Sequence, residues 1–343
     1  MPHLVDVTEF AGNPISTRSN LSVFRHSVFG VRLESDFPIP ELSESGATDG
    51  PLWRIETRRS DPPAEVESLI GSEIVHADVA VRAYSARGLL RMTFDDTGTF
   101  DVLATDRTIV WYPGAHPTEA AVRADLLGRV IALAAHADGC LTLHASAVSI
   151  DGQGIAFLGP KHAGKSTLAL ALVRNGARLL ADDAVVTRLD QAGEAWGAVG
   201  VQRPRLWTDS VHALEVMPSS TDGDKPTVGL RPDQLTRTAV PLRACYVLRP
   251  SATTDVVVSR GPRLQPVHAA LSLVQFSKIG GLLGGSEAPV VLERAAALAE
   301  AVPLYVVHVA RALDRLDAVA EEIIGWHRTG LVPNVASWLA IGS

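Results

Sequence analysis

The stretch FLGPKHAGKSTLALAL (157–172) places two glycines, with four residues between them, ahead of a lysine and two hydroxyl side chains. It matches the pattern G-x-x-x-x-G-K-[ST] at each fixed position, which Gly159, Gly164, Lys165 and Ser166 occupy. An apolar strand pattern precedes the loop and an amphipathic helix pattern follows it, in the order that a Walker A motif, or P-loop, requires. The sequence therefore predicts a strand, a phosphate-binding loop and a helix.

The predicted loop is suited to the phosphates of ATP. Its glycines let successive backbone N–H groups turn toward an anion, and the following helix adds further N–H groups and the positive end of its dipole. We expect Lys165 to reach the β- and γ-phosphates and the Ser166 hydroxyl to bind Mg²⁺. Lys161 and His162 occupy positions that the pattern leaves free, so their side chains are expected to face solvent. The full set expected at the nucleotide is Gly159, Pro160, Lys161, His162, Ala163, Gly164, Lys165, Ser166 and Thr167.

Lysine is scarce in this chain, which strengthens the motif. The sequence has 31 lysines and arginines together, and only Lys161, Lys165, Lys225 and Lys278 are lysines. Two of the four stand inside one eight-residue loop. An accidental match to the pattern is therefore the weaker interpretation.

Two acids and a histidine are the candidates for chemistry beside the loop. Asp182 and Asp183 follow a strand expected over 178–181, whose end in a parallel sheet would lie at the carboxyl edge, near the phosphates. Adjacent residues of an extended chain point in opposite directions, so one carboxylate can face Mg²⁺ or the acceptor while the other faces the structure. His144 lies within an apolar strand expected over 141–150, where a satisfied core histidine is the alternative.

Composition and periodicity divide the chain into two domains and a tail. With 343 residues, 46% of them hydrophobic, it can bury two ordinary cores. Residues 1–116 show short strands and turns and are expected to form a β-rich domain. From Thr118 the pattern becomes helical, and 117–330 read as alternating strands and helices, which predicts an α/β domain. Residues 331–343 are expected to form a tail.

Several classes of protein are disfavoured. The net charge of −7 argues against nucleic acid as the main partner, and the apolar runs are too short to span a membrane. No secretory signal is recognisable and two cysteines make no disulfide framework, so a cytoplasmic location is expected. A metalloenzyme is disfavoured because His136, Cys140 and His144 lack a second ligand cluster, and a dehydrogenase because no G-x-G-x-x-G stands at a βα turn. Turn and surface roles are expected for His26, Asp95 and Asp96.

The ordered segments LHASAV (143–148), IAFLGPKHAGKSTLALAL (155–172) and NGARLLADDAVV (175–186) resemble the catalytic domain of the HPr kinase/phosphorylase family, bacterial P-loop protein serine kinases. That family has a strand histidine, a P-loop and a paired aspartate after the next strand, in this order. The resemblance implies an α/β P-loop kinase domain of the HPr-kinase catalytic type, preceded here by the β-rich domain. It also admits a homo-oligomer, because members of the family form hexamers.

The same resemblance implies roles for the candidate residues. His144 would orient the acceptor or its base, Asp182 would take the hydroxyl proton, and Asp183 would assist with the metal or the substrate. The two carboxylates could exchange these roles. The segment GVQRPRLWTDS (200–210) lacks the glutamate that the family uses for Mg²⁺, so the phosphorylase activity is not implied.

A second resemblance concerns the acceptor. The segments VFGVRLESDFPIPEL (28–42), VQRPRLW (201–207) and DGDKPTVGL (222–230) are similar to divergent HPr-kinase-like proteins, among them kinases that phosphorylate lasso-peptide precursors. Lys225, in the last segment, could close over the nucleotide or be a plain turn lysine. Four arginines could bind a phosphate or an acidic acceptor through their planar guanidinium groups: Arg203, Arg205, Arg243 and Arg249.

These observations favour an ATP- and Mg²⁺-dependent kinase. It would transfer the γ-phosphoryl group to a serine or threonine hydroxyl of a peptide or small protein, with a lasso-peptide-type precursor as one candidate. Two alternatives stay open: a small-molecule kinase, and a nucleotide-gated binding module with little turnover. The missing glutamate favours the binding module, whereas the set of His144, Asp182 and Asp183 favours an enzyme.

Overall fold

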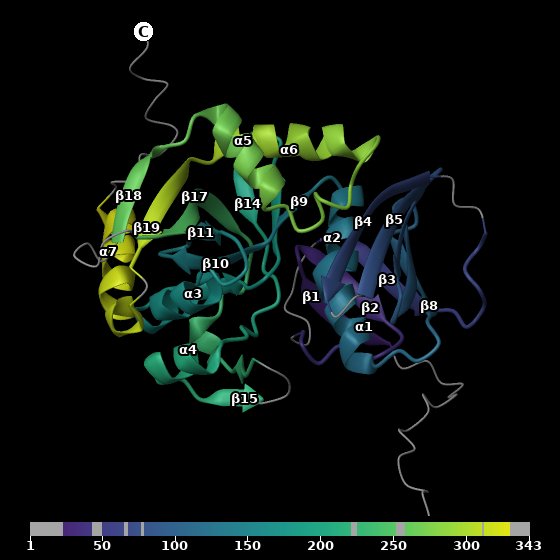
Figure 1. The fold of residues 1–343 in the computed structure, drawn as a ribbon, viewed down its shortest axis with the longest axis horizontal. Coiled ribbons are helices and arrows are strands. Elements are labelled where there is room, and N and C mark those ends of the chain that lie inside the picture. Colours follow the sequence, from purple (N-terminus) through teal and green to yellow (C-terminus); the bar gives the residue numbers. More distant parts are fainter. Residues whose placement is uncertain are drawn as a thin grey trace, which may run out of the picture.

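A computed structural model describes residues 23–42, 50–64, 68–76, 79–220, 225–251, 258–310 and 312–329. They form a mixed α/β structure with an eight-stranded, a nine-stranded and a two-stranded sheet (Figure 1). The expected tail 331–343 and part of the loop 222–230 lie outside these described residues. No helix within them is long and apolar enough to cross a membrane.

The eight-stranded sheet comes from the first third of the chain. Its strands lie in the order β1-β2-β3-β8-β7-β6-β5-β4, with parallel pairing only where β3 meets β2 and β8. Alternation of buried and less buried side chains, as with Val81 and Ala83 of β5, gives the sheet one well-packed face. The bounds are β1 (Phe24–Val28), β2 (Val31–Ser35), β3 (Leu52–Thr57), β4 (Ser68–His76), β5 (Val79–Ala86), β6 (Leu89–Phe94), β7 (Gly98–Leu103) and β8 (Thr108–Pro113).

A helical segment follows and packs between the two large sheets. It consists of α1 (Glu119–Asp125), a π-helical turn (Leu126–Val130) and α2 (Ile131–Ala137). The helix begins where the sequence predicts, because the Thr118 side chain accepts a hydrogen bond from the backbone N–H of Ala121 at 3.3 Å.

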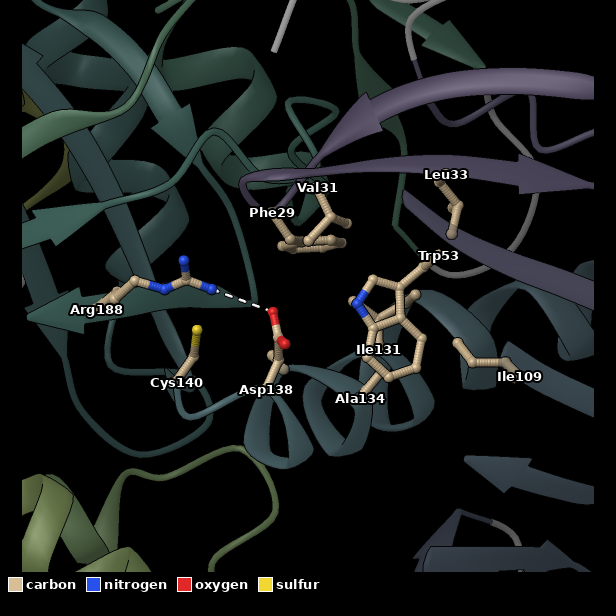
Figure 2. A pocket seen from close by; sticks show the side chains of 11 residues that line it. Phe29, Val31, Leu33, Trp53, Ile109, Ile131, Ala134, Asp138, Cys140 and Arg188 are labelled. Atoms are coloured by element: carbon tan, nitrogen blue, oxygen red, sulfur yellow. Dashed lines mark hydrogen bonds and ion pairs between the residues drawn. The ribbon is translucent and has the colours of Figure 1, made fainter. Parts of the chain in front are cut away.

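The junction of this helical segment with its neighbours is closely packed. A cavity of about 20 Å³, with room for about one water molecule, lies between α2 and the eight-stranded sheet (Figure 2). Trp53 of β3 and Ile131 of α2 are among its lining residues. At its edge Arg188 pairs with Asp138 at 3.1 Å, beside the buried thiol of Cys140. The cavity is a packing gap and not a candidate site.

The nine-stranded sheet carries the predicted loop. Its main path is β12-β10-β11-β17-β14-β13-β9, and β19 adds to β17 with β18 outside it. The bounds are β9 (Leu141–Leu143), β10 (Ala145–Ile150), β11 (Gln153–Leu158), β12 (Arg178–Ala181), β13 (Val185–Leu189), β14 (Ala195–Gly197), β17 (Val240–Pro250), β18 (Val258–Arg263) and β19 (Leu304–Val309).

Helices cover both faces of this sheet, as its continuously apolar strands require. In β11, Ile155 and Phe157 belong to the core shared with α3 (Lys165–Arg174) and α7 (Leu316–Arg328). Ala156 and Leu158 belong to the core shared with α5 (Pro266–Gln275) and α6 (Glu287–Ala301). Figure 1 shows α3 and the α5–α6 pair on opposite sides of the sheet.

Two details of this sheet differ from the sequence-based expectation. The sheet is mixed and not purely parallel: β10 lies between β11 and β12 and is antiparallel to both, so β12 still runs in the direction of β11 and ends at the same edge. The strand expected over 141–150 is also broken at His144, where the chain changes from pairing with β13 to pairing with β11 and β12. His144 therefore stands at a break between two strands and not in the middle of one.

Candidate functional site

A cleft of about 480 Å³ lies over the loop at 159–166. The loop forms one wall, and His144, Asp183 and Lys278 belong to another. Glu73 and Val75 of β4, in the eight-stranded sheet, also line it. The cleft therefore opens between the two large sheets, and residues far apart in the sequence meet in it.

The loop joins β11 to α3, and its backbone carbonyl groups bind the ammonium of Lys165. Gly164 takes φ +87° directly before the helix, a left-handed conformation that glycine adopts without strain. The Lys165 ammonium donates hydrogen bonds to the carbonyl oxygens of Gly159 at 2.8 Å and Pro160 at 3.1 Å. Burial lowers the pKa of Lys165 to about 8, although Asp183 and Asp182 act in the opposite direction.

His144 connects this lysine to the paired acids. Its Nε2 lies 3.2 Å from the Lys165 ammonium, which can only donate, so Nε2 accepts and the ring hydrogen is on Nδ1. Nδ1 then donates to the backbone oxygen and carboxylate of Asp183, each at 3.2 Å. The break in the strand makes this orientation possible, and the backbone N–H of His144 donates to the carbonyl of Phe276 at 2.7 Å.

Asp182 lies beneath the loop. Its side chain is buried, and Oδ1 accepts hydrogen bonds from Ser146 at 2.5 Å and from Ser166 at 2.9 Å. Burial raises its pKa, against the effect of these two hydrogen bonds, and the charge of Asp183 adds to the increase. The carboxylate and the Ser166 hydroxyl are thus presented together at the start of α3.

Asp183 faces the cleft, and its side chain is 60% exposed. Its φ of +70° turns the chain sharply after Asp182, so the two carboxylates point to different surroundings. The Lys278 ammonium lies 2.5 Å from Oδ2. Desolvation acts to raise the pKa of Asp183, but Lys278 and His144 outweigh it and hold the pKa well below its usual range.

Ser146 and Lys278 were not among the sequence-based candidates. Ser146 is hidden in an apolar strand, two residues after His144, and gives no signal of its own. Lys278 comes 95 residues after Asp183 and is placed by its backbone N–H, which donates to Thr142 at 2.8 Å. The scarcity of lysine was the available signal, because all four lysines of the chain line this cleft.

Seven of the nine predicted nucleotide residues line the cleft, and Gly159 and Pro160 are not among its lining residues. The side chains of Lys161 and His162 are exposed, as expected, but they line its mouth, and His162 stacks on Trp207. Thr167 donates to the hydroxyl of Ser210 at 3.1 Å in α4 (Thr208–Ala213). The loop residues that line the cleft are Lys161, His162, Ala163, Gly164, Lys165, Ser166 and Thr167.

Only some of the other basic residues proposed from the sequence line the cleft. Arg205 and Lys225 line the cleft, whereas Arg203, Arg243 and Arg249 are not among its lining residues. Arg243 pairs instead with Glu194 at 2.9 Å.

Several acids and histidines outside the cleft contact other side chains or the backbone. Asp95 pairs with Arg82, Asp96 accepts from the backbone N–H of Thr97, and His136 contacts Glu287 and Arg294. Within the part of the chain that the structure describes, no three His, Cys, Asp or Glu residues are grouped as a metal site.

Comparisons with known proteins add little. No protein-family model matches the sequence, and no curated protein matches it. Among solved structures, the Hpr(Ser) kinase/phosphatase from Coxiella burnetii is similar, with 14% sequence identity and a TM-score of 0.30. The match covers 55% of this chain and 97% of the other. A likeness at this level supports no conclusion about this chain, so the function has to be argued from the residues of the cleft.

Proposed function

We propose that this protein is an ATP- and Mg²⁺-dependent phosphotransferase that transfers the γ-phosphoryl group to a serine or threonine hydroxyl of a peptide or small protein. One observation carries the proposal. The lysine of a G-x-x-x-x-G-K-S loop lies within hydrogen-bond reach of His144, which stands between β9 and β10, and the serine of the loop donates to Asp182 at the end of β12, beside one cleft.

The loop would hold the triphosphate. Phosphoryl transfer depends mostly on positioning and on neutralising charge, because the transferred group carries its negative charge on three oxygens. Lys165 is held at the loop by two carbonyl oxygens, and Lys161, Lys225 and Arg205 line the same cleft. This concentration of cations in a chain of net charge −7 supports a polyanionic ligand.

The residues around Ser166 fit a magnesium ion. Mg²⁺ prefers oxygen ligands and binds through one or two carboxylates together with substrate phosphates. The Ser166 hydroxyl and the Asp182 carboxylate, 2.9 Å apart at the start of α3, supply such oxygens. The bound ion would neutralise charge on the β- and γ-phosphates. We therefore propose Ser166 and Asp182 as the protein ligands, with Asp183 free for a different role.

Asp183 is the better placed of the two acids to receive the acceptor. It is exposed in the cleft, whereas Asp182 is buried and accepts two serine hydrogen bonds. A carboxylate with a depressed pKa stays ionised and can accept a hydrogen bond from the acceptor hydroxyl, which orients it for in-line attack. His144 and Lys278 fix the position of this carboxylate.

A peptide or small protein is proposed as the acceptor because the cleft is open and is bordered by β4 of the eight-stranded sheet as well as by the loop. A precursor of the lasso-peptide type is one member of this class. The test is incubation with γ-labelled ATP, Mg²⁺ and separate panels of serine-containing peptides and small hydroxyl metabolites. We expect label on peptides and its loss with Lys165→Ala. Label on metabolites alone would change the acceptor class, and no transfer to either panel would contradict the proposal.

A further inference from the structure

Trp207 and His162 form an aromatic pair at the mouth of the cleft. Their ring centroids are 5.5 Å apart and the rings are inclined by 24°, which is a stacked arrangement. The indole of Trp207 is 43% exposed, and the ammonium of Lys225 lies 4.5 Å from its centroid. All three side chains line the cleft.

The position of this indole is fixed relative to the loop. The backbone N–H of Leu206, directly before Trp207, donates to the carbonyl of Pro226 at 3.0 Å, which holds Lys225 beside the indole. Trp207 immediately precedes α4, and the hydrogen bond from Thr167 to Ser210 ties α4 to α3. A flat apolar surface is therefore presented at a set distance from the phosphate-binding residues.

His162 links the pair directly to the loop. It is three residues before Lys165 and takes φ +68°, a left-handed conformation that is uncommon for a histidine. This turn carries the imidazole to the indole. A planar group stacked at Trp207 would thus lie next to the loop that holds Lys165, which is the arrangement that a nucleotide requires of its base and its phosphates.

We propose that Trp207, backed by His162, stacks against the base of the nucleoside triphosphate whose phosphates the 159–166 loop holds. This inference rests on the function proposed above. Every base has a π face that can stack on an aromatic side chain, so the contact gives affinity without strong preference among bases. Lys225 is long and flexible, and its ammonium can move from the indole to a phosphate oxygen when the base takes its place.

The test measures the contribution of the base to affinity separately from that of the phosphates. Dissociation constants for ATP and for inorganic tripolyphosphate, both with Mg²⁺, would be measured by calorimetry for the wild-type chain and for Trp207→Ala, Trp207→Phe and Lys165→Ala. We expect Trp207→Ala to weaken ATP binding by about 5- to 150-fold, the range that loss of one stacked base implies, and to change tripolyphosphate binding by less than about twofold. Trp207→Phe should retain much of the ATP affinity. Trp196→Ala, which removes an indole of β14 outside the cleft, serves as the matched control.

The two proposals fail in different ways. Equal weakening of both ligands by Trp207→Ala, or no weakening of ATP, would overturn the base-stacking inference while leaving the phosphate site intact. Unchanged binding of both ligands by Lys165→Ala would overturn the proposed function itself. A second readout does not depend on folding of the alanine variant: ATP, but not tripolyphosphate, should change the wild-type tryptophan fluorescence, and Trp207→Phe should abolish that change. An equal response to both ligands would contradict the inference.

Discussion

The Ser166 hydroxyl lies 2.9 Å from the carboxylate of Asp182, and this contact joins the glycine-rich loop to the end of β12. The two residues are 16 positions apart in the sequence and meet because β12 and β11 end at the same edge of the sheet. The neighbouring Asp183 turns the other way, into the cleft. The two adjacent acids thus lie in different surroundings, with Asp182 buried beneath the loop and Asp183 exposed in the cleft.

Asparagine substitutions should separate the two acids. Asp183→Asn is expected to reduce phosphoryl transfer by about 100-fold, because the acceptor hydroxyl loses the carboxylate that orients it, while the ATP dissociation constant changes little. Asp182→Asn should instead weaken the dependence on Mg²⁺, measured as the half-saturating metal concentration for ATP binding. If Asp183→Asn transferred phosphate at the wild-type rate, the proposed role of Asp183 in orienting the acceptor hydroxyl would have to be abandoned.

The same Asp182→Asn variant should be more stable than the wild-type chain. Asparagine can accept the hydrogen bonds from Ser146 and Ser166 without a buried charge, so a gain of about 1 kcal/mol in the free energy of unfolding is expected. The folded-state pKa of Asp182 is raised, so its ionised form destabilises the fold. The gain should therefore be full at neutral pH and shrink as pH falls and the wild-type carboxyl becomes protonated. Thermal unfolding of both proteins at several pH values measures it, and a variant less stable at neutral pH would contradict the prediction.

Local sequence pattern was sufficient for the elements around the loop. The strand expected over 178–181 is β12 with the same bounds, and the helix expected after the loop is α3, which begins at Lys165. These elements depend on short-range periodicity and on the glycines of the loop, both of which are visible in the sequence.

The pairing of strands and residues that are distant in the sequence could not be predicted from such local patterns. The break at His144 occurs inside an apolar run without glycine or proline, where the chain changes strand partners for reasons of tertiary packing. The position of Lys278 depends on a backbone contact with Thr142, and that of β10 between β11 and β12 on strand order. The spacing of apolar residues along the sequence predicts neither the position of Lys278 nor the place of β10 in the sheet. Only the scarcity of lysine pointed toward Lys278, through composition and not through pattern.

Nucleotide affinity should fall as pH rises through about 8. The pKa of Lys165 is about 8, so its ammonium loses its proton within the working range of the assay, and the neutral amine attracts phosphate less. Above pH 7.5 the phosphates are already fully ionised, so their titration does not interfere. ATP dissociation constants between pH 7.5 and 9.5 should rise by up to about tenfold per pH unit above 8 in the wild-type chain. The profile of Lys165→Gln should be flat, and an equally steep profile in that variant would exclude Lys165 as the titrating group.

Loss of Lys278 should change the pH profile of transfer. The Lys278 ammonium helps to hold the pKa of Asp183 low, so Lys278→Met should raise that pKa toward its ordinary value. The acidic limb of the kcat profile should then move to higher pH, because Asp183 must be ionised to accept the acceptor hydroxyl. Arg243→Met removes a cation of β17 that does not line the cleft and serves as a control. An unchanged acidic limb in Lys278→Met would mean that Asp183 does not govern the rate.

The eight-stranded sheet contains a buried ion pair whose loss should affect stability without affecting the cleft. Arg91 of β6 and Asp101 of β7 form two hydrogen bonds, at 2.5 and 2.7 Å, and their side chains are 6% and 4% exposed. Arg91→Met would leave the Asp101 charge buried without its cation, which costs about 3 to 5 kcal/mol. Denaturant unfolding should show this loss, whereas Arg82→Met, which breaks the exposed pair with Asp95, should cause a much smaller one. Because neither arginine lines the cleft, the ATP affinity of whatever fraction remains folded should equal that of the wild-type chain. A loss in Arg91→Met no larger than that in Arg82→Met would show that the pair contributes no more than a surface contact.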